Sequence, residues 1–146
     1  MDRVSNDPFD LDRFVQAQSS SYQDALAELT RGRKESHWMW FVFPQIAGLG
    51  FSPTAQFYAL ASLAEARAYL AHPVLGPRLR ACLAAVLQVP NASAHDIFGS
   101  PDDLKFRSSL TLFAQAAPDE TAFAQALERY FDGEGDPRTL EILSRG

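Results

Sequence analysis

The fold of this chain is decided by one short apolar run, Trp38-Met39-Trp40-Phe41-Val42-Phe43. Its side chains are apolar on both faces of a period-two pattern, so an extended strand here would have to be buried on both sides. No second run of comparable character is present in the sequence to pair with it. Because a lone strand leaves backbone N–H and C=O groups without partners, we expect a short helix or an extended buried segment, in an all-α protein with no sheet.

The sequence on either side of this run carries repeated signals for helix starts. Ser52-Pro53, Ser100-Pro101 and Asp136-Pro137 each place a capping residue before a proline suited to the first helical position. Capping boxes are predicted at Ser62–Glu65 and, with aspartate as the acid, at Ser100–Asp103. Together with stop signals and apolar spacing, these starts predict about eight short helices, near residues 9–18, 21–31, 53–60, 63–71, 74–89, 101–116, 120–131 and 137–144.

Length and composition indicate one self-sufficient domain. The 146 residues include 47% hydrophobic and 21% charged side chains, which are ordinary proportions for a globular protein. A chain of this length buries roughly 70% of its unfolded surface. We expect a single compact helical domain over residues 9–146, preceded by a disordered, polar N-terminus over residues 1–8.

The same composition bears on localisation and partners. The sequence has no apolar run of about 18 residues and no apolar signal segment near its start, so we expect neither a membrane span nor secretion. A single cysteine, Cys82, is typical of a cytoplasmic protein without disulfides. The net charge of −5 argues against nucleic acid as a partner, because a nucleic-acid interface needs a basic face. The oligomeric state stays open.

No metal and no cofactor are expected. The three histidines, His37, His72 and His95, are scattered without helical i, i+4 spacing or a carboxylate partner. The sequence also contains no Walker loop, no Gly-x-Ser-x-Gly elbow and no His-Glu-x-x-His motif. His37 has two interpretations: a structural histidine that donates one ring N–H to a backbone carbonyl, or a general acid or base.

A candidate ligand site begins in residues 31–45, which concentrate both tryptophans and several cations. The glycine-containing turn over residues 48–52 then leads into a helix start, where free backbone N–H groups form a natural anion site. Cationic side chains would add to the binding of a phosphate, and an aromatic ring could stack on a base. The predicted ligand-binding residues are Lys34, Gly50, Ser52, Thr54 and Lys105 for phosphate, Trp38, Trp40 and Tyr58 for the base, and His37 and Gln45 beside them.

Two features of this candidate site have a simpler explanation. The aromatic side chains are also explained as the hydrophobic core, with the cations as its solvated rim, because large apolar residues are usually buried. Glu65 is explained by its place in a capping box. If its helix start faced the aromatic cleft, Glu65 would instead be a catalytic carboxylate able to stabilise an oxocarbenium-like transition state.

The run Ser36-His37-Trp38-Met39-Trp40-Phe41-Val42-Phe43-Pro44-Gln45 resembles the signature of a bacterial family of domains of unknown function, often labelled calpastatin. The resemblance extends from about Phe14 to Leu140, with matching segments at Gly48-Leu49-Gly50, in the stretch from Tyr69 to Leu79, at Ile97-Phe98-Gly99 and from Lys105 through Phe113. It implies an all-α single domain without an established activity. The calpastatin label finds no support in the residues, because calpastatin inhibitory segments are disordered and polar.

The layout is more remotely similar to the helical superfamily associated with NAD and ADP-ribose, which includes a bacterial N-glycosidase. Those proteins place an aromatic segment before a Pro-Thr-x-Glu helix start, where this chain has Pro53-Thr54-Ala55-Gln56. Gln56 in place of the acid counts against glycosidic hydrolysis, whereas binding of a nucleotide sugar would survive the change.

Two hypotheses about function follow from these features. In the first, the domain binds or processes a small phosphorylated nucleoside or ADP-ribose-like molecule; any reaction would be N-glycosidic bond hydrolysis, with Glu65 as the acid. In the second, it is a non-enzymatic protein-interaction domain with the aromatic segment as its core. Convergence of Lys34, His37, Gln45 and Lys105 on one concave pocket would favour the first hypothesis, which fails if these four side chains scatter.

Overall fold

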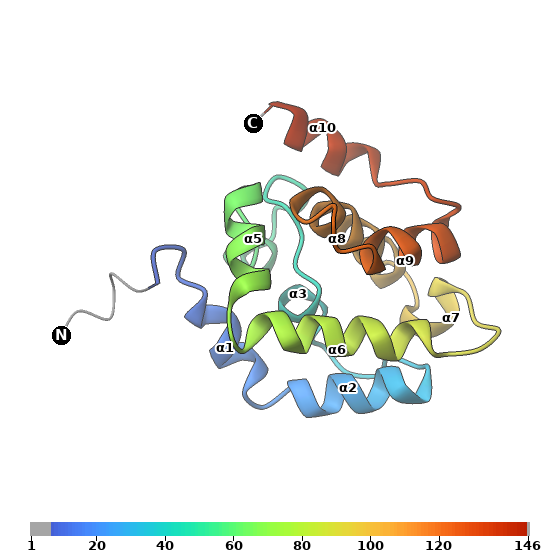
Figure 1. Ribbon diagram of the computed structural model, residues 1–146. Helices are drawn as coiled ribbons and strands as arrows, with labels where there is room; N and C mark the ends of the chain where they lie inside the picture. The colour runs from blue at the N-terminus through green and yellow to red at the C-terminus, as the bar shows by residue number, and fades with distance from the viewer. Residues whose placement is uncertain (1–6, 146) are drawn as a thin grey trace.

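The described part of the chain, residues 7–145 of a computed structural model, folds into ten helices joined by short turns (Figure 1). This confirms the predicted all-α class; an isolated parallel bridge between Ile46 and Leu60 is the nearest approach to a sheet within these residues. The helices are α1 (Asp12–Gln18), α2 (Tyr22–Arg31), α3 (Met39–Val42), α4 (Pro53–Phe57), α5 (Leu63–Ala71), α6 (Leu75–Leu87), α7 (Ala94–Phe98), α8 (Asp102–Ala116), α9 (Ala122–Phe131) and α10 (Pro137–Arg145).

The predicted disordered N-terminus lies mostly outside the described residues. Of the segment 1–8, only the last two residues are described. The Asp7 carboxylate accepts hydrogen bonds from the backbone N–H of Leu11 at 2.7 Å and of Asp12 at 3.0 Å. It thereby satisfies two N–H groups at the start of α1.

Two serine caps form where the sequence predicts them. The Ser52 hydroxyl accepts from the backbone N–H of Ala55 at the start of α4, and the Ser62 hydroxyl accepts from that of Glu65 at the start of α5, each at 3.1 Å. The other hydrogen bond of the predicted Ser62–Glu65 capping box forms one residue earlier than expected. The Glu65 carboxylate accepts from the backbone N–H of Ala61, not from that of Ser62.

The capping box predicted at Ser100–Asp103 was wrong. Helix α8 begins at Asp102, so Pro101 occupies the N-cap position and no side chain caps this helix. A complete box forms instead at Ser93 and Asp96, at the start of the five-residue helix α7. Helices α7 and α3 are the two short elements that raise the count of the described helices above the expected eight.

The apolar run forms mainly a short helix, one of the two conformations expected for it. Its middle four residues make the single turn of α3, which packs against α1, α6 and α8 and lies near the centre of the molecule in Figure 1. Trp38, Met39, Val42 and Phe43 are buried, whereas Trp40 is partly exposed. The chain then continues extended, where the Leu60 backbone bonds with the Gln45 carbonyl and the Ala47 N–H at 2.9 and 2.8 Å, so its backbone groups are satisfied without a sheet.

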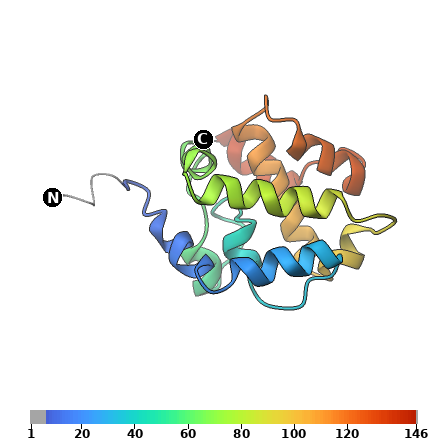
Figure 2. The same cartoon turned by 60° about the horizontal axis from the view of Figure 1, so that its bottom comes forward.

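The core is rich in aromatic side chains that meet edge to face. The ring of Phe43 lies 5.2 Å from that of Phe106 and 5.9 Å from that of Phe98, and Phe14 lies 5.1 Å from Tyr69, all with nearly perpendicular planes. Helices α2 and α6 run side by side in the same direction in both views (Figures 1 and 2). Helix α8 contacts α3, α5, α7, α9 and α10, and therefore organises the side of the molecule that carries the groove described below.

Helices α5 and α6 meet at Gly76, and this position is expected to reject any larger side chain. A Cβ atom at residue 76 would lie 2.1 Å from the backbone oxygen of Leu70. Although alanine is the better helix former by about 1 kcal/mol, Gly76→Ala should lower the free energy of unfolding by about 1–3 kcal/mol through this overlap. Urea denaturation tests the prediction, and a Gly76→Ala protein as stable as the wild type would contradict it.

Candidate ligand-binding groove

A surface groove opens between α3, the 45–50 loop, α8 and the start of α10. Its volume is about 300 Å³, and it is lined by Trp40, Gln45, Leu49, Gly50, Pro101, Leu104, Lys105, Ser108, Asp136 and Arg138. A smaller recess of about 100 Å³ adjoins it, lined by Trp40, Gln45, Ile46, Ala47, Gly48, Leu49, Gly50, Ala55, Gln56, Tyr58 and Ala59. Trp40 and Gln45 line both spaces, so they lie where the groove and the recess meet.

The centre of the groove is a tryptophan ring beside a lysine ammonium. The Nζ atom of Lys105 lies 4.0 Å from the centroid of the Trp40 ring, within the range of a cation–π interaction. Contacts between α3 and α8 bring these two side chains together. The same ammonium lies 3.3 Å from the Asp102 carboxylate one helical turn away. The groove therefore combines a flat apolar surface with a positive charge.

The Lys34 side chain is largely buried and does not line the groove. Its Nζ atom lies 2.8 Å from Asp102 and donates to the backbone carbonyl of Ser36 at 2.7 Å, and its side chain is 8% exposed. It also lies 5.1 Å from the centroid of the Trp38 ring. Lys34 and Lys105 thus share the Asp102 carboxylate, with Lys34 facing the core and Lys105 facing the groove.

The glycines of the 48–50 loop shape the wall opposite α8. Gly48 has a φ of +102°, which side chains rarely adopt, and a Cβ atom at Gly50 would lie 2.8 Å from the Cβ of Ala55. The Gly48 carbonyl accepts a hydrogen bond from Nη2 of Arg138 at 3.2 Å. Arg138 thereby brings a second positive charge to the groove from α10.

Arg138 and Asp136 line the groove, although neither is among the site residues predicted from the sequence. The Asp136-Pro137 helix start was predicted, and Asp136 does cap α10, accepting from the Thr139 N–H and hydroxyl at 2.9 and 2.7 Å. Nothing in the sequence indicates that this helix start borders the groove, since Arg138 and Gly48 are 90 residues apart.

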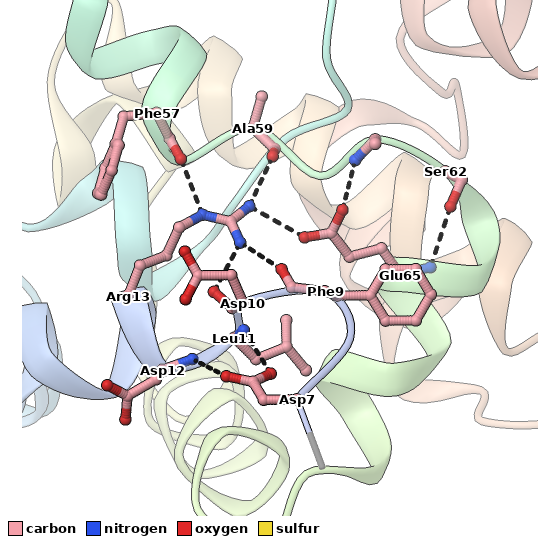
Figure 3. Close-up of polar contacts among 11 residues, drawn as sticks. Asp7, Phe9, Asp10, Leu11, Asp12, Arg13, Phe57, Ala59, Ser62 and Glu65 are labelled. Carbon is pink, nitrogen blue, oxygen red and sulfur yellow. Dashed lines mark hydrogen bonds and ion pairs between the residues drawn. The ribbon is translucent and has the colours of Figure 1, made fainter. Parts of the chain in front are cut away.

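Glu65 lies in a buried ion pair, separate from the lining residues of the groove. The Oε2 atom of Glu65 lies 2.9 Å from Nη2 of Arg13 (Figure 3), and its other oxygen accepts from the Ala61 N–H at 2.9 Å. Its side chain is 5% exposed. Both carboxylate oxygens are therefore committed to holding the start of α5 against α1.

The other predicted site residues divide between the groove and elsewhere. Trp40, Gln45, Gly50, Tyr58 and Lys105 line the groove or its recess. Trp38 is 1% exposed and belongs to the core. Ser52, Thr54 and His37 are exposed and lie outside the residues that line the groove, so the structure does not bring them together with Lys105. The expected convergence of four polar side chains is therefore only partial, because Gln45 and Lys105 line the groove whereas Lys34 and His37 do not.

The described residues offer few groups for covalent or metal chemistry. Over residues 7–145, no cluster of three or more His, Cys, Asp or Glu side chains could hold a metal ion. Burial raises the pKa of the Cys82 thiol to about 12, so it is not a thiolate nucleophile at neutral pH. Within the same span, no helix is both long and apolar enough to cross a lipid bilayer.

Fold and site together define a small all-α domain with an aromatic, cationic surface groove. The chain belongs to the family described as "protein of unknown function (DUF1810)", which it matches over residues 8–143. It is 52% identical to the conserved hypothetical protein Rv1873 from Mycobacterium tuberculosis, whose crystal structure superposes with a TM-score of 0.92, covering 94% of this chain and 98% of that one. No curated protein matches the chain. The expected membership of a family of unknown function is thereby confirmed.

Proposed function

We propose that this domain binds a small phosphorylated nucleoside or ADP-ribose-like molecule in the groove. The observation that carries the proposal is the partly exposed ring of Trp40 beside the ammonium of Lys105, 4.0 Å away, at the junction of the groove and the recess. The Lys105 ammonium lies over the Trp40 ring, so a base would stack on the opposite face, or on the same face once the ammonium has moved to a phosphate. An adjacent cation can donate charge-assisted hydrogen bonds to a phosphate.

Charge supports an anionic ligand. The chain carries a net charge of −5, yet the groove brings together Lys105 from α8 and Arg138 from α10. Asp102 is shared by two lysine ammoniums, so one carboxylate offsets two positive charges there. Asp136 also lines the groove, so two cations face one carboxylate in its lining. The groove is thus a small local positive site on an acidic protein, and a phosphate bound there would contact cations from two helices.

The geometry favours binding over hydrolysis. A catalytic acid must lie within hydrogen-bond reach of the reacting group. Glu65, the residue predicted for that role, is buried against Arg13, and it does not line the groove or its recess. Gln56 lines the recess in place of the acid that the remote resemblance implies, and an amide is neither an acid nor a base at neutral pH. Binding alone is therefore the function that we propose.

A protein-interaction role is the second candidate, and exposed apolar side chains favour it. Phe51 is 80% exposed, and Phe57 and Leu104 are each 56% exposed. Leu104 lines the groove, and Phe51 directly follows the Gly50 that lines it. Exposed apolar side chains around a cleft can contact a protein partner.

Tryptophan fluorescence is expected to report nucleotide binding directly. The chain has two tryptophans, of which Trp38 is buried and Trp40 lines the groove. Titration with AMP, ADP and ADP-ribose should quench the Trp40 emission and leave that of Trp38. Trp40→Phe should abolish the quenching. Lys105→Met should weaken binding about tenfold or more, because a hydrogen bond to a charged group contributes roughly 1.5–3 kcal/mol.

Arg31→Met is the matched control for the charge change. Arg31, the last residue of α2, forms an exposed ion pair with Glu35 at 2.7 Å. Arg31 does not line the groove, so its loss should leave the nucleotide affinity unchanged. Absence of quenching and of thermal stabilisation with all three nucleotides would refute the nucleotide proposal. The protein-interaction role would then be the better explanation of the groove.

A further inference from the structure

Gln45 is held rigidly by its backbone while its side chain is left free. Its carbonyl accepts from the Leu60 N–H at 2.9 Å, and the next residue, Ile46, pairs with Leu60 in the isolated parallel bridge. Pro44, immediately before it, is buried. In contrast, the Gln45 side-chain amide has no hydrogen-bond partner among residues 7–145, and it lines both the groove and the recess.

The neighbouring polar side chains have already used part of their hydrogen-bonding capacity. The Ser108 hydroxyl donates to the Leu104 carbonyl at 3.1 Å, and the Gln56 amide donates to the Phe51 carbonyl at 2.8 Å. Asp136 accepts two hydrogen bonds at Oδ2 at the start of α10, so its other oxygen can only accept. Gln45 differs from these three neighbours, because both the donor and the acceptor of its amide are free of bonds to the described residues.

The chemistry of an amide restricts what it can recognise. A glutamine side chain presents an acceptor oxygen next to a donor NH₂ group. Its best partner is a ring edge that carries a donor beside an acceptor, and glutamine pairs in this way with the N6 amino group and N7 of adenine. Gln45 and Trp40 line the same two spaces, so a base bound in either space lies between walls that include both residues.

We propose that Gln45 sets a preference of the groove for adenine, by pairing its amide with the N6 amino group and N7 of that base. The inference rests on the proposed nucleotide-binding function and deepens it, since it names the chemical group of the ligand that the protein recognises. Stacking on Trp40 and charge from Lys105 do not depend on which base is bound. The hydrogen bonds of Gln45 do depend on the ring edge that the base presents.

Gln45→Glu is expected to change which nucleotide binds better. Glutamate keeps the size of glutamine but only accepts hydrogen bonds, so it loses the donor that a ring nitrogen of adenine requires. A carboxylate can instead accept from the N1–H and N2–H₂ groups of guanine. The ratio of AMP to GMP affinity, measured by Trp40 quenching, should shift about tenfold toward GMP. Gln45→Leu should weaken both nucleotides.

Gln125→Glu is the control, because Gln125 is exposed on α9 and lines neither the groove nor the recess. This variant should leave the AMP to GMP ratio unchanged. An unchanged ratio in Gln45→Glu, or an equal shift in Gln125→Glu, would overturn the role of Gln45 while nucleotide binding stands. Absence of quenching by either nucleotide in the wild type would instead refute the proposed function, and the specificity role with it. Thermal unfolding midpoints close to that of the wild type would show that the variants are folded.

Discussion

Replacing Glu28 by alanine is expected to lower the free energy of unfolding by about 3–5 kcal/mol. Glu28 is 5% exposed, and its carboxylate accepts four hydrogen bonds. The donors are the backbone N–H of Glu35 at 2.7 Å, the N–H and hydroxyl of Ser36 at 2.9 and 2.5 Å, and the indole N–H of Trp38 at 2.9 Å. Alanine would leave these donors without an acceptor and release the loop that leads from α2 into the aromatic run.

The contribution of Glu28 should depend on pH. Burial by itself raises the pKa of Glu28, but the hydrogen bonds from Ser36, Glu35 and Trp38 outweigh it and lower the pKa from 4.5 to about 2. The native state therefore binds this proton more weakly than the unfolded state does. The stabilisation is complete above pH 4.5 and is lost as the pH falls toward 2, for a total of about 3 kcal/mol.

Urea unfolding of the wild type and Glu28→Gln between about pH 7 and pH 3 checks this expectation. Glutamine is uncharged throughout, so the difference between the two proteins should shrink as the pH falls. Glu35→Gln is the control, because Glu35 is 60% exposed in a surface pair and should change stability by less than about 1 kcal/mol. A wild-type to Glu28→Gln difference that is constant with pH would contradict the assignment.

Arg13→Met should also destabilise the fold by about 3–5 kcal/mol, because removing one partner of a buried pair leaves the other charge uncompensated. The Arg13 side chain is 11% exposed and pairs with Glu65 at 2.9 Å. The guanidinium also donates hydrogen bonds of 2.7–2.9 Å to the backbone carbonyls of Phe57, Ala59, Phe9 and Asp10 (Figure 3). One guanidinium thus fastens α1 to the chain between α4 and α5.

A double-mutant cycle with Glu65→Gln measures the coupling between these two side chains. The two variants together should cost less than the sum of their separate effects, since the second change removes the charge that the first leaves unpaired. Nucleotide affinity of folded Glu65→Gln should equal that of the wild type. Additive effects on stability would show that the pair is not coupled, and a loss of affinity alone would restore Glu65 as a ligand-site residue.

The all-α class could be predicted because its signals are local. Ser52 and Ser62 cap α4 and α5 as the sequence indicates, and an apolar run without a pairing partner excludes a sheet. Trp40, Gln45 and Lys105, chosen from their chemistry alone, line one groove in the structure. The start of α8 could not be placed from Ser100, since a cap sequence competes with neighbouring packing, and the complete box formed one helix earlier.

Which side of the aromatic run faces the core was decided only by the tertiary structure. Trp38 precedes the helical turn as its N-cap, whereas Trp40 lies within the turn. Trp38 enters the core and Trp40 faces the groove, and the surrounding helices determine which is which. The two lysines divide in the same way, because Asp102 holds Lys34 inward and leaves Lys105 beside Trp40.

The sequence by itself determined the helical class, the cap residues and the residue types suited to a ligand site. It could not determine that Glu65 would be paired with Arg13, or that Arg138 would reach Gly48. Both contacts join segments far apart in the chain, and their formation depends on how whole helices pack. Helix formation depends on neighbours within a turn or two, whereas a groove is defined by side chains that meet only after the core has closed.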